Sequence, residues 1–134
     1  MKITYHFDKR PTIDEIIELY DRAGLRRPTT DKERMELIFG HSNLVVTAWD
    51  NNKLAGLARS VTDWGWSCYL ADLAVNPEYQ KSGIGKKLIE LTKEKVGEKS
   101  MVLLQSVPTA MEYYPKVGME KVNNGFIIQR KPLD

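Results

Sequence analysis

The stretch from Leu73 to Leu88 constrains the fold of this chain more than any other part of the sequence. Its apolar beginning predicts the end of a β-strand, and Asn76-Pro77 stops that strand because proline cannot donate to a central ladder. Gly83 and Gly85 then precede an amphipathic stretch that predicts a partly exposed helix closed by Gly97. A strand, a turn, a glycine-bearing loop and a helix start therefore follow one another in this stretch.

The glycine loop has the features of an anion site. Where a loop ends and a helix begins, unpaired backbone N–H groups and the helix dipole converge, and glycines keep side chains away. The loop matches neither common nucleotide fingerprint, because no Gly-Lys-Ser/Thr ending and no third glycine are present. The pattern is also that of an ordinary helix start, so the context has to decide between the two.

Upstream of the glycine loop, the sequence predicts two helices after a first strand. Apolar residues alternate with polar ones from Ile3 to Phe7, as in a strand with one buried face. Thr12 with Glu15 forms a capping-box pattern for a helix over Ile13–Ala23, with Gly24 as its stop. A second such pattern, Thr30 with Glu33, predicts a short helix that ends at Gly40.

The remaining elements are mostly strands. Leu44–Trp49 and Leu54–Val61 flank a turn and predict an antiparallel hairpin. Trp66–Val75 is the candidate for a central strand because of its aromatic and branched residues. Further along, the sequence predicts a strand over Met101–Ser106, a short helix over about Thr109–Lys116, and one or two strands that end near Arg130.

Size and charge exclude several classes of protein. The 134 residues predict one domain, and the 20 basic against 18 acidic residues give a net charge of only +2, too little for nucleic-acid binding. No apolar run reaches the length of a membrane span, and Cys68 is the only cysteine, so we expect a cytoplasmic protein without a disulfide. His6 and His41 lack metal-ligand spacing, so we expect no metal.

Two motifs carry a resemblance to a known family. Gln80-Lys81-Ser82-Gly83-Ile84-Gly85, preceded by Asp72–Pro77, resembles the Gln/Arg-x-x-Gly-x-Gly/Ala loop of the GNAT acetyltransferase superfamily and its preceding strand. Ala110–Met119 resembles the Ala-x-x-Phe-Tyr-x-x-x-Gly-Phe segment of that family, with Tyr113 and Met119 in place of phenylalanines. The resemblance implies an α/β (α+β) GNAT fold over residues 1–134, with a mixed, mostly antiparallel twisted sheet of six to seven strands flanked by about four helices.

The resemblance implies acetyl-CoA as the cofactor and names the residues that would bind it. The pyrophosphate would lie on the loop amides, with Gln80 shaping the loop and Lys86 alongside. Leu73 and Val75 would pair with the pantetheine arm, and Ala74 or Val75 would direct an N–H at the thioester carbonyl. The cofactor-binding set is therefore Leu73, Ala74, Val75, Gln80, Lys81, Ser82, Gly83, Ile84, Gly85 and Lys86.

Transfer to an amine also requires an acid and a base. An alkyl amine has a pKa of about 10.4, so some group must accept its proton at neutral pH. Asp72 is the first candidate for this base, and the alternative is that it only pairs a basic residue; Glu112 and Asp63 are further candidates. Tyr114 aligns with the tyrosine that protonates the leaving thiolate in this family, and the alternative is a packing role.

The binding site for the acceptor amine has several candidate residues. By resemblance, the candidates are Arg26-Arg27-Pro28, Arg59, Asp63, Trp64 and Trp66. The shortness of the chain favours a small-molecule amine over a protein amine. Two other functions stay open, a coenzyme A sensor without turnover and a transferase for another acyl-CoA. The chain is expected to be a monomer or a homodimer, with no nucleic-acid or membrane partner.

Overall fold

A four-stranded antiparallel sheet organises the first part of the chain. The structure, a computed structural model, describes residues 2–133 and divides the chain after Leu104 into two compact units. In the first unit the strands lie side by side in chain order, β1 (Ile3–His6), β2 (Leu44–Asp50), β3 (Lys53–Thr62) and β4 (Cys68–Val75). The predicted hairpin is therefore confirmed, and the strand predicted from Trp66 begins two residues later.

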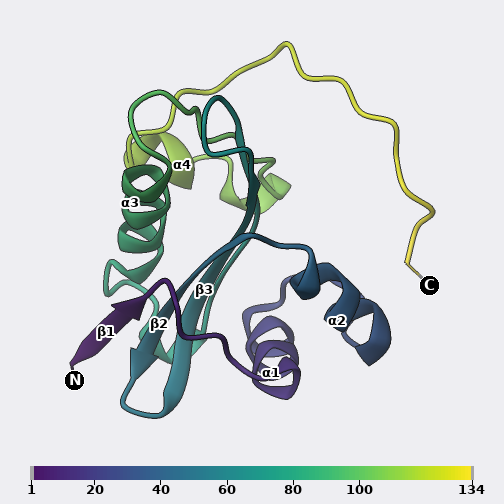
Figure 1. Cartoon of the computed structure of the whole chain (residues 1–134), viewed down its shortest axis with the longest axis vertical. Helices are drawn as coiled ribbons and strands as arrows, with labels where there is room; N and C mark the ends of the chain where they lie inside the picture. The colour runs from purple at the N-terminus through teal and green to yellow at the C-terminus, as the bar shows by residue number, and fades with distance from the viewer. Residues whose placement is uncertain (1, 134) are drawn as a thin grey trace. The chain divides into compact units, whose positions relative to one another are not determined.

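Helices cover both faces of this sheet. α1 (Ile13–Ala23) and α2 (Lys32–Gly40) lie on one face and α3 (Ile84–Val96) lies on the other, as Figure 1 shows. The core between the sheet and the first two helices contains Ile16, Leu19, Tyr20, Met35, Phe39, Val45, Trp49, Leu54, Leu57 and Ala74. This two-sided burial explains why β2 is apolar almost throughout.

Local capping signals place most helix ends where the sequence predicts them. Thr12 and Glu15 form the predicted capping box of α1, and Gly24 ends that helix in the left-handed conformation. α2 departs from the prediction, because Asp31 rather than Thr30 is its N-cap and accepts a hydrogen bond from the Arg34 amide at 3.1 Å. An aspartate is an equally good cap, and it lies one residue closer to the helix.

The predicted count of six to seven strands is wrong, since residues 2–133 form a sheet of four. The expected strand over 101–106 is reduced to one parallel bridge between Leu103 and Tyr69. The second unit has a 3-10 turn (Pro108–Ala110) and the short helix α4 (Tyr113–Lys116), with no strand within residues 105–133. The tail has only brief apolar stretches between Asn and Gly residues, too short a pattern to form a ladder without a partner strand.

α3 packs closely against the sheet at Gly56. A Cβ at this position would lie 2.9 Å from Ile84 Cγ2 and 3.2 Å from Leu88 Cδ1. We expect Gly56→Ala to lower the free energy of unfolding by about 1–3 kcal/mol, because the added methyl overpacks the helix–sheet contact. Urea denaturation measures this. Gly40→Ala is the control, because no described atom lies within 4 Å of its added Cβ, and an equal loss there would contradict the assignment.

Candidate functional site

The glycine loop ends at an uncapped helix N-terminus. Gly83 is the N-cap of α3 with a φ of 82°, and no side chain among the described residues bonds to the first amides of this helix. Lys81 also has a positive φ of 67°, and Ser82 Oγ donates a hydrogen bond to the Tyr79 carbonyl. The first helical bond runs from Lys87 N to Gly83 O at 3.0 Å, so the amides before it are available to an anion.

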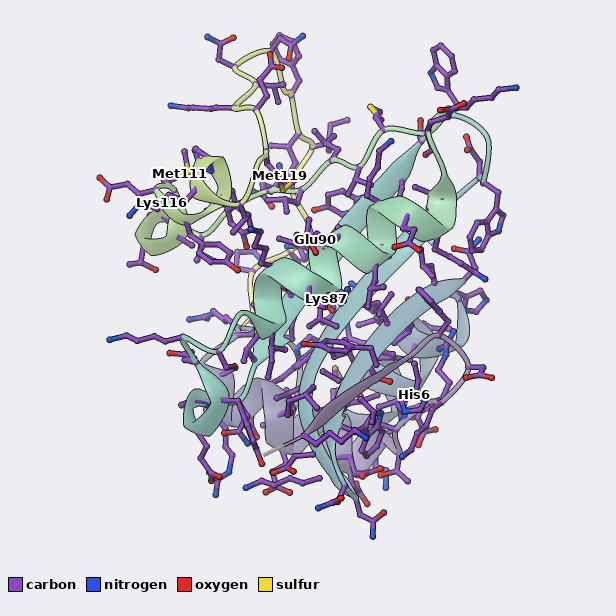
Figure 2. The ribbon with its side chains drawn as sticks, turned by 90° about the vertical axis from the view of Figure 1, so that its left-hand side faces the viewer. His6, Lys87, Glu90, Met111, Lys116 and Met119 are labelled. Carbon is purple, nitrogen blue, oxygen red and sulfur yellow. The ribbon has the colours of Figure 1, made fainter. Side chains whose placement is uncertain are left out.

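Space and charge around Gly83 suit a phosphate group. A Cβ built at Gly83 meets no described atom within 4 Å, so the space next to the N-terminus of α3 is open. The first turn of α3 carries no acidic residue, and Lys81 and Lys86 are exposed beside it. Figure 2 shows Lys87 on α3 as well, one turn into the helix. The residues present therefore fit the pyrophosphate of coenzyme A.

The second part of the candidate site is the outer edge of β4. Asn76 N donates to Ala55 O at 2.9 Å, so the backbone groups of Asn76 are directed at β3. Because this direction alternates along an antiparallel strand, Leu73 and Val75 direct their N–H and C=O groups away from β3. No backbone hydrogen bond within residues 2–133 uses these outward groups. They are the two residues predicted to pair with an extended ligand.

A β-bulge interrupts β4 just before this edge. The register runs from Arg59 opposite Asp72 directly to Ser60 opposite Leu70, so Ala71 is the extra residue. Toward the start of the strand, Leu70 N donates to Leu103 O at 2.8 Å and Leu103 N donates to Cys68 O at 2.9 Å. The neighbouring segment is therefore bonded to β4 before the bulge and not after it.

Asp72 is buried at the bulge and held by three side chains. Its carboxylate is 1% exposed and accepts hydrogen bonds from Arg27 Nε at 2.6 Å, Arg59 Nε at 2.5 Å and the Tyr20 hydroxyl at 2.8 Å. Burial raises the pKa of this carboxyl, but Arg59 first and Arg27 second outweigh it, so the pKa lies below its usual value. For Asp72 the sequence left two roles open, a general base and a partner of a basic residue. The structure contains the ion pair of the second alternative.

Tyr20 belongs to the site although the sequence analysis placed it only on the apolar face of a helix. Burial first and the Asp72 charge second raise its pKa well above 10, so the hydroxyl stays a donor. No sequence signal pairs it with a carboxylate 52 residues away. The hydrogen-bonding partners of Asp72 could be found only by folding the chain.

The acceptor candidates lie in different surroundings. Arg59 has a side chain only 13% exposed and also bonds Ser42 Oγ at 3.0 Å, so it is committed to the interior. Asp63 accepts hydrogen bonds from the amides of Ser67, Gly65 and Trp66, and these bonds, with that from Ser67 first, lower its pKa. These bonds shape the β3–β4 loop and present Trp64 and Trp66 to solvent, 47% and 76% exposed.

Tyr114 lies in the second unit, on α4. Its ring packs edge-on against Tyr113 with centroids 5.2 Å apart, and its carbonyl accepts hydrogen bonds from the amides of Val117 and Met119. Burial first and Tyr113 second raise the pKa of Tyr114 above 10. The phenol is therefore protonated at neutral pH, as a proton donor must be.

A hollow of about 550 Å³ lies apart from the glycine loop, where the β2–β3 turn faces α1. Its carboxylates already have partners, since Glu15 accepts from Thr12 N at 2.9 Å and Asp50 accepts from the Tyr79 hydroxyl at 2.6 Å. This hollow is not a candidate for the acetyl-transfer site, because its lining contains neither the uncapped amides of α3 nor the open edge of β4.

Within residues 2–133, no helix has the length and apolarity needed to cross a membrane.

Comparisons with known proteins show which family this chain resembles. The model of the acetyltransferase (GNAT) family matches residues 11–119. The uncharacterized N-acetyltransferase ycf52 of Porphyra purpurea is 27% identical over 124 residues, which cover 87% of this chain and 70% of that protein.

Two solved structures share the fold. A GNAT family acetyltransferase from Streptococcus pneumoniae superposes with a TM-score of 0.77 at 26% identity, covering 97% of this chain and all of that one. AAC(6')-Iy, bound to the bisubstrate analog CoA-S-monomethyl-acetylneamine, has a TM-score of 0.72 at 12% identity, covering 98% of this chain and all of that one. The resemblance of the two sequence motifs is thus confirmed, and the chain belongs to the GNAT family of acetyltransferases.

Proposed function

We propose that this protein transfers the acetyl group of acetyl-CoA directly to the primary amine of a small molecule, within a ternary complex. The observation that carries the proposal is the uncapped, amide-lined start of α3 beside the open edge of β4. The first suits a pyrophosphate and the second suits an amide-bearing arm that pairs as an added strand. Acetyl-CoA has both parts, and a cytoplasmic location would agree with the single cysteine.

The residues of the loop and strand would hold the cofactor. The amides from Lys81 to Gly85 would bind the pyrophosphate, with Lys86 adding charge and Gln80 shaping the loop. Leu73 and Val75 would bond the pantetheine arm. An N–H from Ala74 or Val75 would stabilise the charge that develops on the thioester oxygen, a contribution of about a hundredfold to a thousandfold in rate. Of these two, Val75 directs its backbone outward, which favours it for this role.

Direct attack is favoured over an acyl-enzyme. The amine nitrogen would bond to the carbonyl carbon, the C–S bond would break, the amine would lose a proton and the sulfur would gain one. Cys68, the only cysteine, is buried in β4, and burial raises the pKa of its thiol. A thiol that is both covered and protonated is a poor nucleophile.

Three carboxylates, Asp72, Asp63 and Glu112, are the candidates for accepting the proton of the amine. Asp72 has a lowered pKa and accepts hydrogen bonds from three donors, so it is a weak base. We therefore assign it the role of an ion-pair partner rather than that of the general base. Asp63 is occupied by three backbone amides. Glu112, exposed beside Tyr114 in the chain, is the remaining carboxylate.

The amine itself would be recognised by the β3–β4 loop. Trp64 and Trp66 offer two exposed indole rings, on which an apolar or cationic group could stack. Arg59 is not available for an acidic group, because its guanidinium faces Asp72. We therefore propose an acceptor with an apolar or aromatic body rather than an acidic one.

Calorimetric titration with acetyl-CoA, with free CoA as control, tests the proposal. Binding in the micromolar range followed by thiol release with a member of an amine panel would support it. Binding without thiol release for any amine would favour a coenzyme A sensor, and faster turnover of propionyl-CoA or succinyl-CoA would favour another acyl donor. Failure of the folded protein to bind acetyl-CoA would refute the proposal.

The role of Tyr114 gives a separate prediction. Tyr114→Phe removes the hydroxyl and keeps the ring, so we expect the turnover number to fall about a hundredfold while the affinity for acetyl-CoA stays nearly the same. Steady-state kinetics of thiol release measures the first and calorimetry the second. Tyr113→Phe is the matched control on the same helix. Equal turnover in wild type and Tyr114→Phe would remove the assignment.

A further inference from the structure

We propose that Arg27 is a positioning residue that holds the β4 bulge in the shape needed for acyl transfer. The inference rests on the proposed function, because it concerns the strand edge that would bind the thioester end of acetyl-CoA. By sequence, Arg27 belongs to a group of candidate acceptor-binding residues. The structure gives its side chain a different set of contacts.

The contacts of Arg27 reach both sides of the bulge. Its Nε donates to Asp72 Oδ1 at 2.6 Å, and its Nη2 donates to the carbonyl of Ala71, the extra residue of the bulge, at 2.9 Å. One guanidinium thus binds a side chain and the adjacent backbone carbonyl at the same time. The side chain is 30% exposed, so the pair is shielded from most of the solvent.

The Ala71 carbonyl needs such a partner. A bulge residue is left out of the strand ladder, so its carbonyl has no strand partner, and a shielded backbone carbonyl without a hydrogen bond is unfavourable. The planar guanidinium of arginine holds its N–H donors in a fixed fork that suits that carbonyl and a neighbouring carboxylate together, whereas the lysine ammonium is a compact point charge on a flexible stem. The residue type at position 27 is therefore specific to this geometry.

Arg27 and its two acceptors, Asp72 and the Ala71 carbonyl, are called the clamp below. Asp72 connects this clamp to two further elements of the fold. Its second oxygen accepts from Arg59 on β3 and Tyr20 on α1, while Arg27 comes from the segment between α1 and α2. The bulge is thereby held by side chains from α1, from the neighbouring strand β3 and from the segment between α1 and α2. The next outward-directed groups of β4 are those of Leu73, one residue beyond Asp72, so their direction depends on the bulge.

Arg27→Lys tests this role, because it keeps the charge and removes the fork. We expect the turnover number to fall about 10-fold to 100-fold, as a displacement of about 1 Å at a reacting centre can do, with the KM for acetyl-CoA changed less than about threefold. Backbone amide exchange of residues 70–74 should become about tenfold faster in the free protein. Arg34→Lys, on the exposed side of α2, is the matched control and should change neither quantity.

The outcomes test the role of Arg27 separately from the proposed acetyltransferase function. If wild-type protein acetylates no amine, the proposed function fails, and the exchange comparison still decides whether Arg27 holds the bulge. Unchanged exchange and unchanged turnover in Arg27→Lys would overturn the inference. Faster exchange with unchanged turnover would also overturn it, because Arg27 would then support the strand without positioning the reaction.

Discussion

The Gly83→Glu variant is expected to bind acetyl-CoA at least about a hundredfold more weakly than the wild-type protein. Gly83 has a φ of 82°, where a Cβ costs about 1–2 kcal/mol. The open space in front of it would receive a carboxylate within a few ångströms of the amides that would bind the pyrophosphate. At an effective dielectric constant of 20, like charges 4 Å apart repel by about 4 kcal/mol, which alone exceeds a hundredfold.

Gly24→Glu is the matched control for this variant. Gly24 ends α1 with a φ of 73°, and no described atom lies within 4 Å of an added Cβ. The control therefore has the same added charge and a similar backbone strain at a place without a ligand role. Calorimetry on both variants, with circular dichroism to establish folding, separates the effects. Equal affinity of folded Gly83→Glu and wild type would exclude this loop as the pyrophosphate site.

The Asp72→Asn variant is expected to lose about 3–5 kcal/mol of unfolding free energy. Removal of one partner from a buried ion pair leaves the other charge uncompensated, and here two arginines lose their shared carboxylate. For a chain of this size the loss corresponds to a melting temperature lower by about 10 °C or more. Asp14→Asn, which breaks an exposed 3.1 Å pair with Lys32, should cost less than about 1 kcal/mol.

The effect of Asp72 should depend on pH in a defined direction. Its pKa is lower in the folded state than the value of about 3.9 for a free aspartate, so its contribution is complete above that value. As the pH falls below about 4 and through the lowered folded pKa, protonation removes the contribution. Urea denaturation of wild type and Asp72→Asn should therefore give curves that converge in acid. A constant difference down to pH 2 would contradict the ion-pair assignment.

What the sequence predicted well depends on local interactions. The capping box at Thr12, the stop at Gly24 and the glycine loop before α3 each involve residues within a few positions of one another. Such signals act through backbone geometry that neighbouring residues determine. They determined where the helices on both faces of the sheet begin and end.

What the sequence missed depends on distant contacts. Asp72 meets Tyr20, Arg27 and Arg59 across 52, 45 and 13 residues, and no local pattern announces such a meeting. The same is true of the tail, where apolar residues such as Phe126 and Ile128 lie exposed although the sequence predicted strands there. A strand is defined by its partner, and a single sequence does not name that partner.

The close packing of α3 against Gly56 affects which substitutions the loop before α3 can accept. Gly56 pairs with Val75 across the sheet, and its missing side chain lets Ile84, the first residue of α3, approach that point. The separation between the helix start and the strand edge is therefore set by packing through the sheet, independently of the residues that connect them. Substitutions at Pro77 and Glu78, which are exposed, would therefore leave the spacing between the helix start and the strand edge unchanged.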